Sequence, residues 1–181
     1  MGRNPPRRRA AGMSLIEQLM VAAILATLGG VALPSMAKFT QRSRLASAQF
    51  DYLAALNHAR QQAILGGRVT TFCPTHDRRA CAADTRWEDG WLVLDQPPGQ
   101  TRLLRTGSGL PAPFAIRSSG GRRAVRFRPD GTAGGSNLTL LLCHPDDAER
   151  ALTVTVSNAG RIRGGRATPA QVADCRNSAS R

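Results

Sequence analysis

The stretch SNAGRIRGGRA near the C-terminus carries the residues best suited to chemistry with an anion. Arg161 and Arg163 are separated by Ile162 alone, so in an extended strand their side chains share one face and lie about 7 Å apart. That separation is close to the phosphate repeat along a nucleic-acid strand, and the planar guanidinium group offers several donors to a phosphate. The stretch therefore predicts a surface that contacts the phosphate backbone of DNA.

Glycines flank these arginines on both sides. Gly160 is expected to close a turn that follows a strand, and Gly164 with Gly165 leaves the backbone bare, so that a bulky polyanion can approach. Arg166 stands just beyond, and we include Gly160 and Arg166 in the predicted site. The alternative is a solvated hairpin edge whose arginines discourage pairing with another strand.

A second pair of arginines, Arg126 and Arg128, has the same two-residue spacing and is preceded by Arg122 and Arg123. The pair could extend the basic surface, and we add Arg126 and Arg128 to the predicted DNA-binding residues. The alternation also fits any half-buried strand whose intervening apolar residues point inward. Both interpretations stay open at this point.

The distribution of charge is more informative than its amount. Of 25 basic residues 24 are arginine, which a genome rich in G and C can produce without selection on the protein. Residues 102–181, however, carry 13 arginines against 5 acidic residues, net +8, whereas residues 66–101 carry 4 against 5, net −1. Aromatic residues are scarce, and Trp87 and Trp91 are expected in the core or as loop anchors. Binding should therefore rest on phosphates and be indifferent to base sequence.

The four cysteines, an even number behind an export-like segment, indicate two disulfides formed in an oxidising compartment. Three pairings are possible, and we favour Cys73 with Cys81 and Cys143 with Cys175. Zinc binding is the alternative, because His76 lies between the first two cysteines and His144 follows the third. Neither spacing resembles a C-x-x-C pair, so we expect no metal.

Enzymatic activity and a cofactor are not expected. His58 falls on the predicted helix, and the other histidines adjoin cysteines that should be oxidised, which disfavours Cys–His catalysis. Asp146, Asp147 and Glu149 could hold calcium, but a polar turn is the simpler interpretation. The sequence has no glycine-rich phosphate loop with a lysine, so energy for any assembly must come from another protein.

The N-terminus combines three arginines at positions 7–9 with an apolar run that is long enough to cross a bilayer over residues 13–36. A cleaved secretory signal that ends before Lys38 is the alternative. Against cleavage, Glu17 places a costly carboxylate beside the apolar run, and the helical pattern continues past the cleavage point. We therefore expect a single-pass segment in the inner membrane, with the rest of the chain in the periplasm.

The stretch GMSLIE, with basic residues before it and an apolar run after it, resembles the type III signal of type IV pilins and type II secretion pseudopilins. The resemblance implies that a prepilin peptidase removes residues 1–12 by cutting after Gly12 and then methylates Met13, where the family usually has Phe. It also implies that Glu17 pairs with the amine of a neighbouring pilin subunit in a filament core, and that Pro34 is the family's kink-forming proline.

Helical periodicity continues beyond the apolar run and ends at Gly66 and Gly67, which predicts one helix from about residue 13 to 65. Residues 37–66 form its amphipathic half, and residues 67–181 read as short strands separated by turns. The apolar helix face comprises Leu45, Ala48, Tyr52, Leu56, Ala59 and Ala63. The expected strands are 69–73, 91–94, 101–105, 114–117, 124–128, 138–143, 151–157 and 161–163.

This arrangement is the α+β fold of type IV pilins, with a long N-terminal helix packed on an antiparallel β domain. Three further stretches, WEDGWLVL, VRFRPDGTA and VTVSNAGRIR, resemble the GspH/FimT branch of the family. Residues 160–163 match the G-R-x-R motif of FimT-type minor pilins, which implies DNA capture by Arg161 and Arg163 for natural transformation, in a pilus that reaches the cell surface. The alternative is a structural GspH-like pseudopilin, or a pilus-assembly initiator, with no role in DNA binding.

Overall fold

The computed structural model describes residues 14–178, and of residues 29–35, 37 and 38 it describes the backbone alone. The predicted leader, residues 1–12, and the predicted methylation site, Met13, lie outside the described residues. The chain divides into two compact units, Met1–Thr40 and Gln41–Arg181. Each unit is described by itself.

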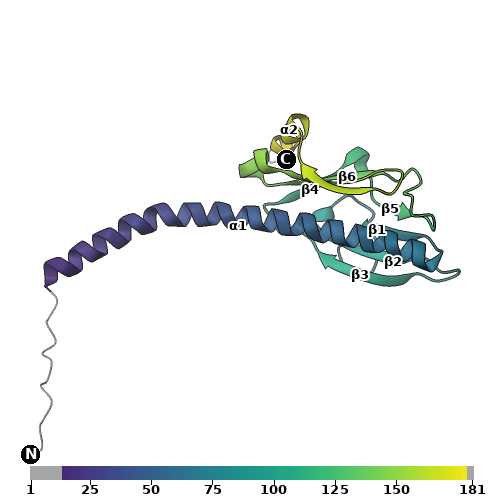
Figure 1. Cartoon of the computed structure of the whole chain (residues 1–181), viewed down its shortest axis with the longest axis horizontal. Helices are drawn as coiled ribbons and strands as arrows, with labels where there is room; N and C mark the ends of the chain where they lie inside the picture. The colour runs from purple at the N-terminus through teal and green to yellow at the C-terminus, as the bar shows by residue number, and fades with distance from the viewer. Residues whose placement is uncertain (1–13, 179–181) are drawn as a thin grey trace, which may run out of the picture. The chain divides into compact units, whose positions relative to one another are not determined.

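Helix α1, Leu15–Gly66, begins in the first unit and ends in the second without a break (Figure 1). In the first unit large apolar side chains are exposed on every side of the helix, as expected of a segment that contacts other apolar groups. Examples are Leu15, Ile16, Leu19, Ile24, Leu25 and Leu28. The sequence predicts a membrane span over residues 13–36, but among the residues that the structure describes no helix is long and apolar enough to cross a membrane.

The second unit contains two antiparallel sheets of four strands each (Figure 1). Sheet A has the order β3-β2-β1-β5, and sheet B has the order β4-β6-β7-β8. In sheet A the strands are β1 Thr70–Pro74, β2 Gly90–Asp95, β3 Arg102–Ser108 and β5 Val125–Phe127. In sheet B they are β4 Ala115–Ser118, β6 Leu138–Cys143, β7 Leu152–Val156 and β8 Ile162–Arg166. Short 3-10 helices occupy Trp87–Asp89, Ser119–Gly121 and Pro145–Arg150.

One apolar core joins the second half of α1 to both sheets. The buried helix face is that predicted from the sequence, and its alanines at four-residue spacing, Ala55, Ala59 and Ala63, let strands approach the helix closely. Facing them are inward side chains such as Phe127 from sheet A and Leu140 from sheet B.

Aromatic residues fill the part of the core between α1 and sheet A. The rings of Phe72 and Trp87 are stacked with centroids 5.3 Å apart, and Tyr52 and Trp91 complete the cluster. The Tyr52 hydroxyl donates a hydrogen bond to the carbonyl of Trp87. Burial raises the pKa of Tyr52, so the hydroxyl remains a donor. Both tryptophans are buried, which leaves neither available to stack on a nucleic-acid base.

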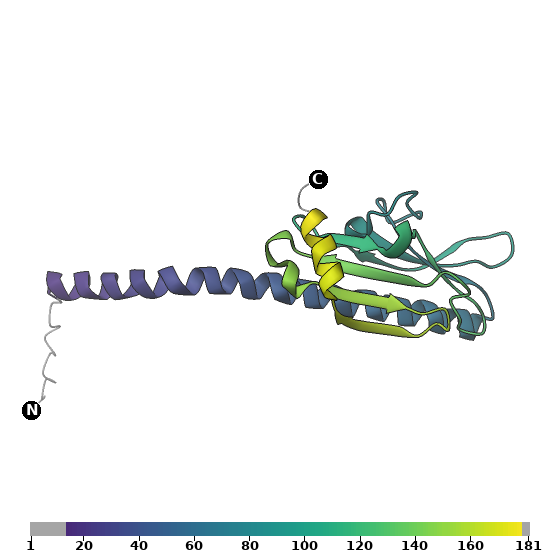
Figure 2. The same cartoon turned by 90° about the horizontal axis from the view of Figure 1, so that it is seen from above.

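A C-terminal helix that the sequence analysis omits, α2 Pro169–Ser178, crosses the strands of sheet B (Figure 2). Val172 and Cys175 of α2 pack on Leu141 of β6 in a second small core. A disulfide joins Cys143 to Cys175, and another joins Cys73 to Cys81. These are the two pairs that we favour from the sequence.

The α+β fold with a long N-terminal helix and antiparallel sheets is confirmed. Each expected strand is present, with ends that differ by up to three residues from the expected ones. The sequence does not reveal that the strands divide into two sheets, because that division depends on contacts between strands distant in the chain.

Candidate nucleic-acid interface

The central arginines of the predicted site lie at strand β8: Arg163 is in the strand, and Arg161 directly precedes its first residue. The strand lies at the edge of sheet B beside β7, with Ile162 opposite Val156 and Arg163 opposite Thr155. Ile162 is half-buried against the core, whereas Arg161 and Arg163 are exposed. The alternation predicted from the sequence is therefore present, and both arginines occupy the outward face.

The backbone before Arg161 is held by a short hydrogen-bonded turn. The amide of Gly160 donates to the carbonyl of Ser157 at 2.8 Å, and the amide of Ser157 donates to the carbonyl of Arg161 at 2.9 Å. The amide of Arg161 also donates to the Ser157 hydroxyl, at 3.1 Å. The position of Arg161 is thus fixed by its main chain on both sides.

Gly160, which the sequence places among the predicted DNA-binding residues, has a packing role in the structure, and its contact with DNA stays a prediction. It is buried, and its φ of +75° lies in the left-handed region that favours glycine. A Cβ atom at this position would lie 1.9 Å from the carbonyl oxygen of Gly131. Gly160 is therefore required so that two loops can touch.

An arginine from α1 fixes the same contact between loops. The Nε atom of Arg60 donates to the carbonyl of Gly131 at 2.9 Å, and the amide of Ala133 donates to the carbonyl of Asn158 at 2.9 Å. These bonds tie the β7–β8 turn to the loop after β5 and to the helix. Sequence reasoning missed Arg60, since no local pattern marks an arginine that binds a distant carbonyl.

Gly164 and Gly165 are exposed, as expected, but Gly164 also lies against the helix. A Cβ atom on Gly164 would lie 2.9 Å from the Cδ1 atom of Leu53. The side-chain amide of Gln49 donates to the carbonyls of Thr153 and Gly165, at 2.8 and 2.9 Å. The lack of a side chain at Gly164 lets α1 approach the edge of sheet B.

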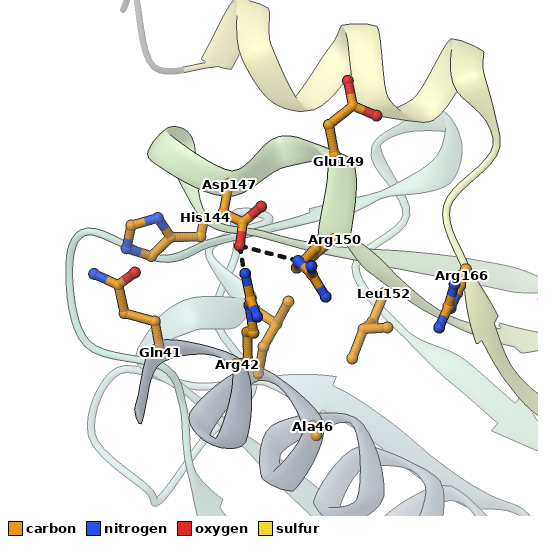
Figure 3. A pocket seen from close by; sticks show the side chains of 10 residues that line it. Gln41, Arg42, Ala46, His144, Asp147, Glu149, Arg150, Leu152 and Arg166 are labelled. Carbon is orange, nitrogen blue, oxygen red and sulfur yellow. Dashed lines mark ion pairs between the residues drawn. The ribbon is translucent and has the colours of Figure 1, made fainter. Parts of the chain in front are cut away.

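Arg166 is separated from the other two arginines of β8. Strand alternation places residues 162, 164 and 166 on the face toward α1, opposite the face of Arg161 and Arg163. Arg166 lines a cavity together with residues of α1 and of the β6–β7 connection (Figure 3). The three arginines predicted to act together thus serve two different surfaces.

Arg126 and Arg128 lie on the other sheet, in or directly after the edge strand β5. Arg126 is exposed between the buried residues Val125 and Phe127, as the half-buried strand interpretation predicts. Arg128 lies close enough to Asp130 to contribute to its lowered pKa, which is due first to the amide of Thr132. The hydrogen bond between Ala133 and Asn158 places the loop after β5 and the β7–β8 turn at one end of the domain.

The arginines of the described chain fall into two groups by their partners. Arg68 and Arg102 pair with Asp95, Arg86 pairs with Asp84 and Asp89, and Arg176 pairs with Glu149. By contrast, within residues 14–178 no hydrogen bond, ion pair or ring contact engages the guanidinium groups of Arg126, Arg161, Arg163 and Arg166. An unpaired, exposed guanidinium group retains its donors for a ligand.

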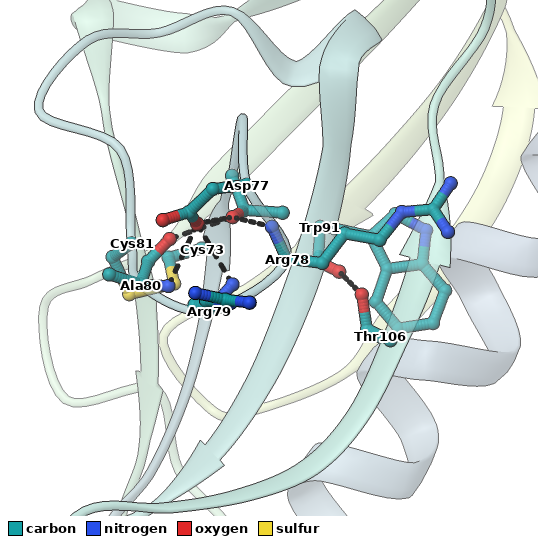
Figure 4. Close-up of a disulfide and its surroundings, with 9 residues drawn as sticks. Cys73, Asp77, Arg78, Arg79, Ala80, Cys81, Trp91 and Thr106 are labelled. Carbon is teal, nitrogen blue, oxygen red and sulfur yellow. Dashed lines mark hydrogen bonds between the residues drawn. A yellow bond between two sulfur atoms is a disulfide. The ribbon is translucent and has the colours of Figure 1, made fainter.

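The loop closed by Cys73 and Cys81 is held by its own hydrogen bonds (Figure 4). Asp77 accepts hydrogen bonds from the amides of Arg79 and Ala80, at 2.8 and 3.1 Å. These amides hold the pKa of Asp77 below its usual range. The loop is thus an ordered structural element.

The histidines and carboxylates considered for metal binding make other contacts. His76 lies between Asp89 and Asp84, at 2.7 and 3.0 Å, and Asp147 faces Arg42 and Arg150. Within the described range, no group of three or more His, Cys, Asp or Glu residues is arranged to hold a metal ion.

The remaining predicted sites concern the N-terminus. Gly12 and Met13 lie outside the described residues. Glu17 lies in the first turn of α1 and is exposed. Its pairing with a neighbouring subunit stays a prediction.

A family model described as type II transport protein GspH matches residues 51–160 of the chain. This chain belongs to that family of pilin-like proteins. Its particular role is that of a minor pilin or pseudopilin in a type II secretion or type IV pilus system.

Individual relatives come from both kinds of system. The type II secretion system protein H of Xanthomonas campestris pv. campestris is 29% identical over 144 residues, covering 75% of this chain and 74% of the relative. The type IV minor pilin FimU of Pseudomonas aeruginosa superposes with a TM-score of 0.54 at 24% identity, over 69% of this chain and 90% of FimU. The minor pseudopilin EpsH of the Vibrio cholerae type 2 secretion system gives a TM-score of 0.52 at 13% identity, over 68% of this chain and 97% of EpsH. The two structures establish the fold, and a structural role in place of an enzymatic one is implied by the family alone.

Proposed function

We propose that this chain is a minor pilin of a type IV pilus that binds DNA without sequence specificity during DNA uptake for natural transformation. The observation that carries the proposal is the pair Arg161 and Arg163. Both side chains are exposed on one face of β8, and their guanidinium groups are unpaired. Arg126 and Arg128 would widen this surface from the neighbouring sheet.

The physical basis of binding is the attraction of arginine to phosphate. Side chains two residues apart on a strand match the phosphate repeat, and each phosphate neutralised releases counterions from the DNA. The buried tryptophans offer no stacking platform, so the bases are not read. Affinity should therefore depend strongly on salt and weakly on sequence.

The N-terminal unit supports assembly into a filament with other pilin subunits. Its exposed apolar side chains need apolar partners, and Glu17 needs a cationic one, such as the free amine of a neighbouring subunit. In this proposal a prepilin peptidase cuts after Gly12 and methylates Met13. Before assembly the protein resides in the inner membrane with its C-terminal domain in the periplasm.

The test compares the full-length chain in mild detergent with the double variant Arg161→Gln/Arg163→Gln. Fluorescence anisotropy with duplexes of two unrelated sequences measures affinity across a salt series. If each arginine neutralises one phosphate, the double variant loses about 2 from the slope of log affinity against log salt, because the slope is about 0.9 per phosphate. Unchanged affinity at low salt would remove these arginines from the mechanism.

The matched control for this experiment is Arg44→Gln. Arg44 is exposed on α1, and within the described part of the chain its side chain makes no hydrogen bond or ion pair. It tests whether the loss of any free arginine weakens binding. Equal losses in Arg44→Gln and in a single β8 variant would mean that net charge, and not the β8 face, attracts DNA.

A second candidate function is a structural pseudopilin of a type II secretion system without a DNA role. The match to the GspH family and the similarity to the Xanthomonas protein favour it. Deletion of the gene, followed by complementation with the arginine double variant, separates the candidates. The pseudopilin is supported if the deletion strain loses protein secretion but not transformation, and the double variant restores secretion. The DNA-binding pilin is supported if the deletion strain loses transformation and the double variant does not restore it.

A further inference from the structure

A cavity of about 400 Å³ lies in the second unit, away from the outward face of β8. Its walls come from three separate segments: Gln41, Arg42, Leu45 and Ala46 of α1, the β6–β7 connection with the first residue of β7, and the end of β8. In Figure 3 His144 and Gln41 lie at one end, Arg166 lies at the other, and Asp147 lies between them with Arg42 and Arg150. The volume falls in the range of pockets that hold small groups.

Two arginines converge on one carboxylate oxygen in the middle of the cavity. The Nε atoms of Arg42 and Arg150 each lie 3.5 Å from Oδ2 of Asp147. Charge-assisted hydrogen bonds between guanidinium and carboxylate groups are typically about 2.7–2.9 Å long, so both contacts are loose. Each guanidinium group is also half-exposed and keeps donors for a second acceptor.

The remaining charges add to this surplus of donors. Arg166 is unpaired within the described residues and reaches the cavity because it faces α1. Glu149 at the rim is already bound by Arg176. The carboxylate of Asp147 therefore meets two guanidinium groups without satisfying them, and Arg166 adds a third guanidinium group to the cavity.

The cavity also has apolar walls and one unsatisfied buried group. Leu45 and Ala46 of α1 face Leu152 of β7. His144 accepts a hydrogen bond from the amide of Asp146 at Nδ1, so its neutral ring carries the proton on Nε2. The Nε2 atom is buried and has no partner among the described residues. An acceptor that displaced Gln41 at this end would satisfy it.

We propose that this cavity binds the carboxylate of an acidic side chain that a neighbouring filament subunit contributes. Arg176 already neutralises Glu149, so Arg42, Arg150 and Arg166 against Asp147 leave an excess of positive charge that attracts a carboxylate. The apolar walls accept the stem of the acidic side chain. The proposal rests on the assembly of pilin subunits and is independent of DNA binding.

The first experiment titrates the full-length chain, in detergent, with the peptide acetyl-Leu-Glu-amide and follows the Nε–H signals of arginine by NMR. Acetyl-Leu-Gln-amide has the same shape without the charge and serves as the matched probe. We expect saturable shifts with the first peptide and at least 10-fold weaker binding of the second. Equal binding of both peptides, or no saturable shift with either, overturns the proposal.

Variants assign the binding to this cavity. Arg150→Gln should weaken binding of the charged peptide about 10-fold, whereas the neighbouring exposed variant Arg44→Gln should leave it unchanged. Near-UV circular dichroism confirms that Arg150→Gln is folded. A parallel titration with inorganic phosphate distinguishes the anions, because phosphate that binds more tightly than the charged peptide would show that the apolar walls do not select the ligand and would overturn the proposal.

The second experiment identifies the occupant in assembled filaments. A photo-crosslinking amino acid replaces Ala46, which lines the cavity, and a second chain carries it at Arg44 as a control. We expect mass spectrometry to find Ala46 crosslinked to a segment of another subunit that contains Asp or Glu. Crosslinks from Ala46 that stay within the chain, or that resemble those from position 44, overturn the proposal. Loss of DNA binding in the β8 variants would leave both results unaffected.

Discussion

The arginines around Asp95 and the arginines at β8 have different roles: the first are paired with an acid inside the domain, and the second are unpaired at its surface. Arg68 and Arg102 both bind the buried carboxylate of Asp95, at 2.9 and 3.1 Å, and hold β2 to its neighbours. Arg161 and Arg163 meet no acid in the described chain and face outward. The excess of arginine in the composition is therefore divided between structure and an available surface.

This difference shows what to look for in any arginine-rich chain. A high arginine content alone does not identify a nucleic-acid site, because codon usage supplies it freely. The informative property is whether the fold provides each guanidinium group with an acceptor.

Gly160→Ala should be the most destabilising change, because it disrupts the contact between Gly160 and Gly131. This contact also holds the turn that precedes the unpaired arginines. The added Cβ atom would lie 1.9 Å from a carbonyl oxygen, and the backbone at position 160 has a positive φ that disfavours alanine. We therefore expect the free energy of unfolding to fall by about 3 kcal/mol. Urea denaturation of the oxidised chain measures the loss. The control is Gly99→Ala, since Gly99 has a φ of +73° but open space around it, and should cost about 1 kcal/mol. Equal losses would show that conformation alone, and not the contact between loops, requires glycine at position 160.

Asp95→Asn should have the next largest effect and lower the free energy of unfolding by about 2 kcal/mol. Removing the charge leaves Arg68 and Arg102 without their anion, but both arginines are partly exposed, which keeps the loss below that of a fully buried pair. The measurement is again urea denaturation at neutral pH. Asp51→Asn is the control, because Asp51 is exposed and makes no hydrogen bond or ion pair in the described chain. A loss in Asp95→Asn no larger than in this control would remove the distinction between the two groups of arginines.

The contribution of the Asp95 carboxylate to the free energy of unfolding depends on pH. Hydrogen bonding to Arg68, followed by the charges of Arg68 and Arg102, holds the pKa of Asp95 below its usual range. Its stabilisation is therefore present above the unfolded pKa of about 3.9 and is lost as pH falls through the lower folded value. The gap in stability between the natural chain and Asp95→Asn should shrink between pH 5 and pH 2.5 in unfolding experiments. A gap that widened on acidification would contradict this sign.

Arg163→Gln should have the smallest effect on stability, a change within about 0.5 kcal/mol, because the side chain has no partner to lose. Thermal unfolding measures this change, and anisotropy with duplex DNA measures the accompanying loss of affinity. The two readouts together separate a binding arginine from a structural one. A destabilisation as large as that of Asp95→Asn would place Arg163 in the structural group.

Local sequence patterns predicted the helix, the strands and the outward direction of Arg161 and Arg163, because all depend on short-range periodicity. Residue spacing also favoured the two cysteine pairs that the structure joins. The C-terminal helix α2 was omitted although its start carries a readable signal. Thr168 and Gln171 form reciprocal side-chain bonds at its N-terminus, and Pro169 occupies the first helical position.

The contacts of Gly160 and Arg166 that the sequence did not indicate are contacts between distant segments. Gly160 looks like an ordinary turn residue, and only the fold brings it against Gly131. Arg166 continues the row of arginines in the sequence, but the alternation of the strand turns it toward α1. The alternation of side chains along the strand could be predicted from the sequence. The sequence did not show that α1 lies on the face to which Arg166 points.

The approach of Gly160 to Gly131 also constrains how this sequence can change over evolutionary time. A Cβ atom at position 160 would meet the carbonyl oxygen of Gly131, and a Cβ atom at position 131 would meet the side chains of Ile64 and Arg60, so either substitution requires a neighbouring segment to move. Relatives should therefore keep each glycine, or replace it together with a change in the segment that it contacts. The unpaired arginines Arg161 and Arg163 are free to vary singly, which lets a lineage gain or lose affinity for an anion while the fold stays the same.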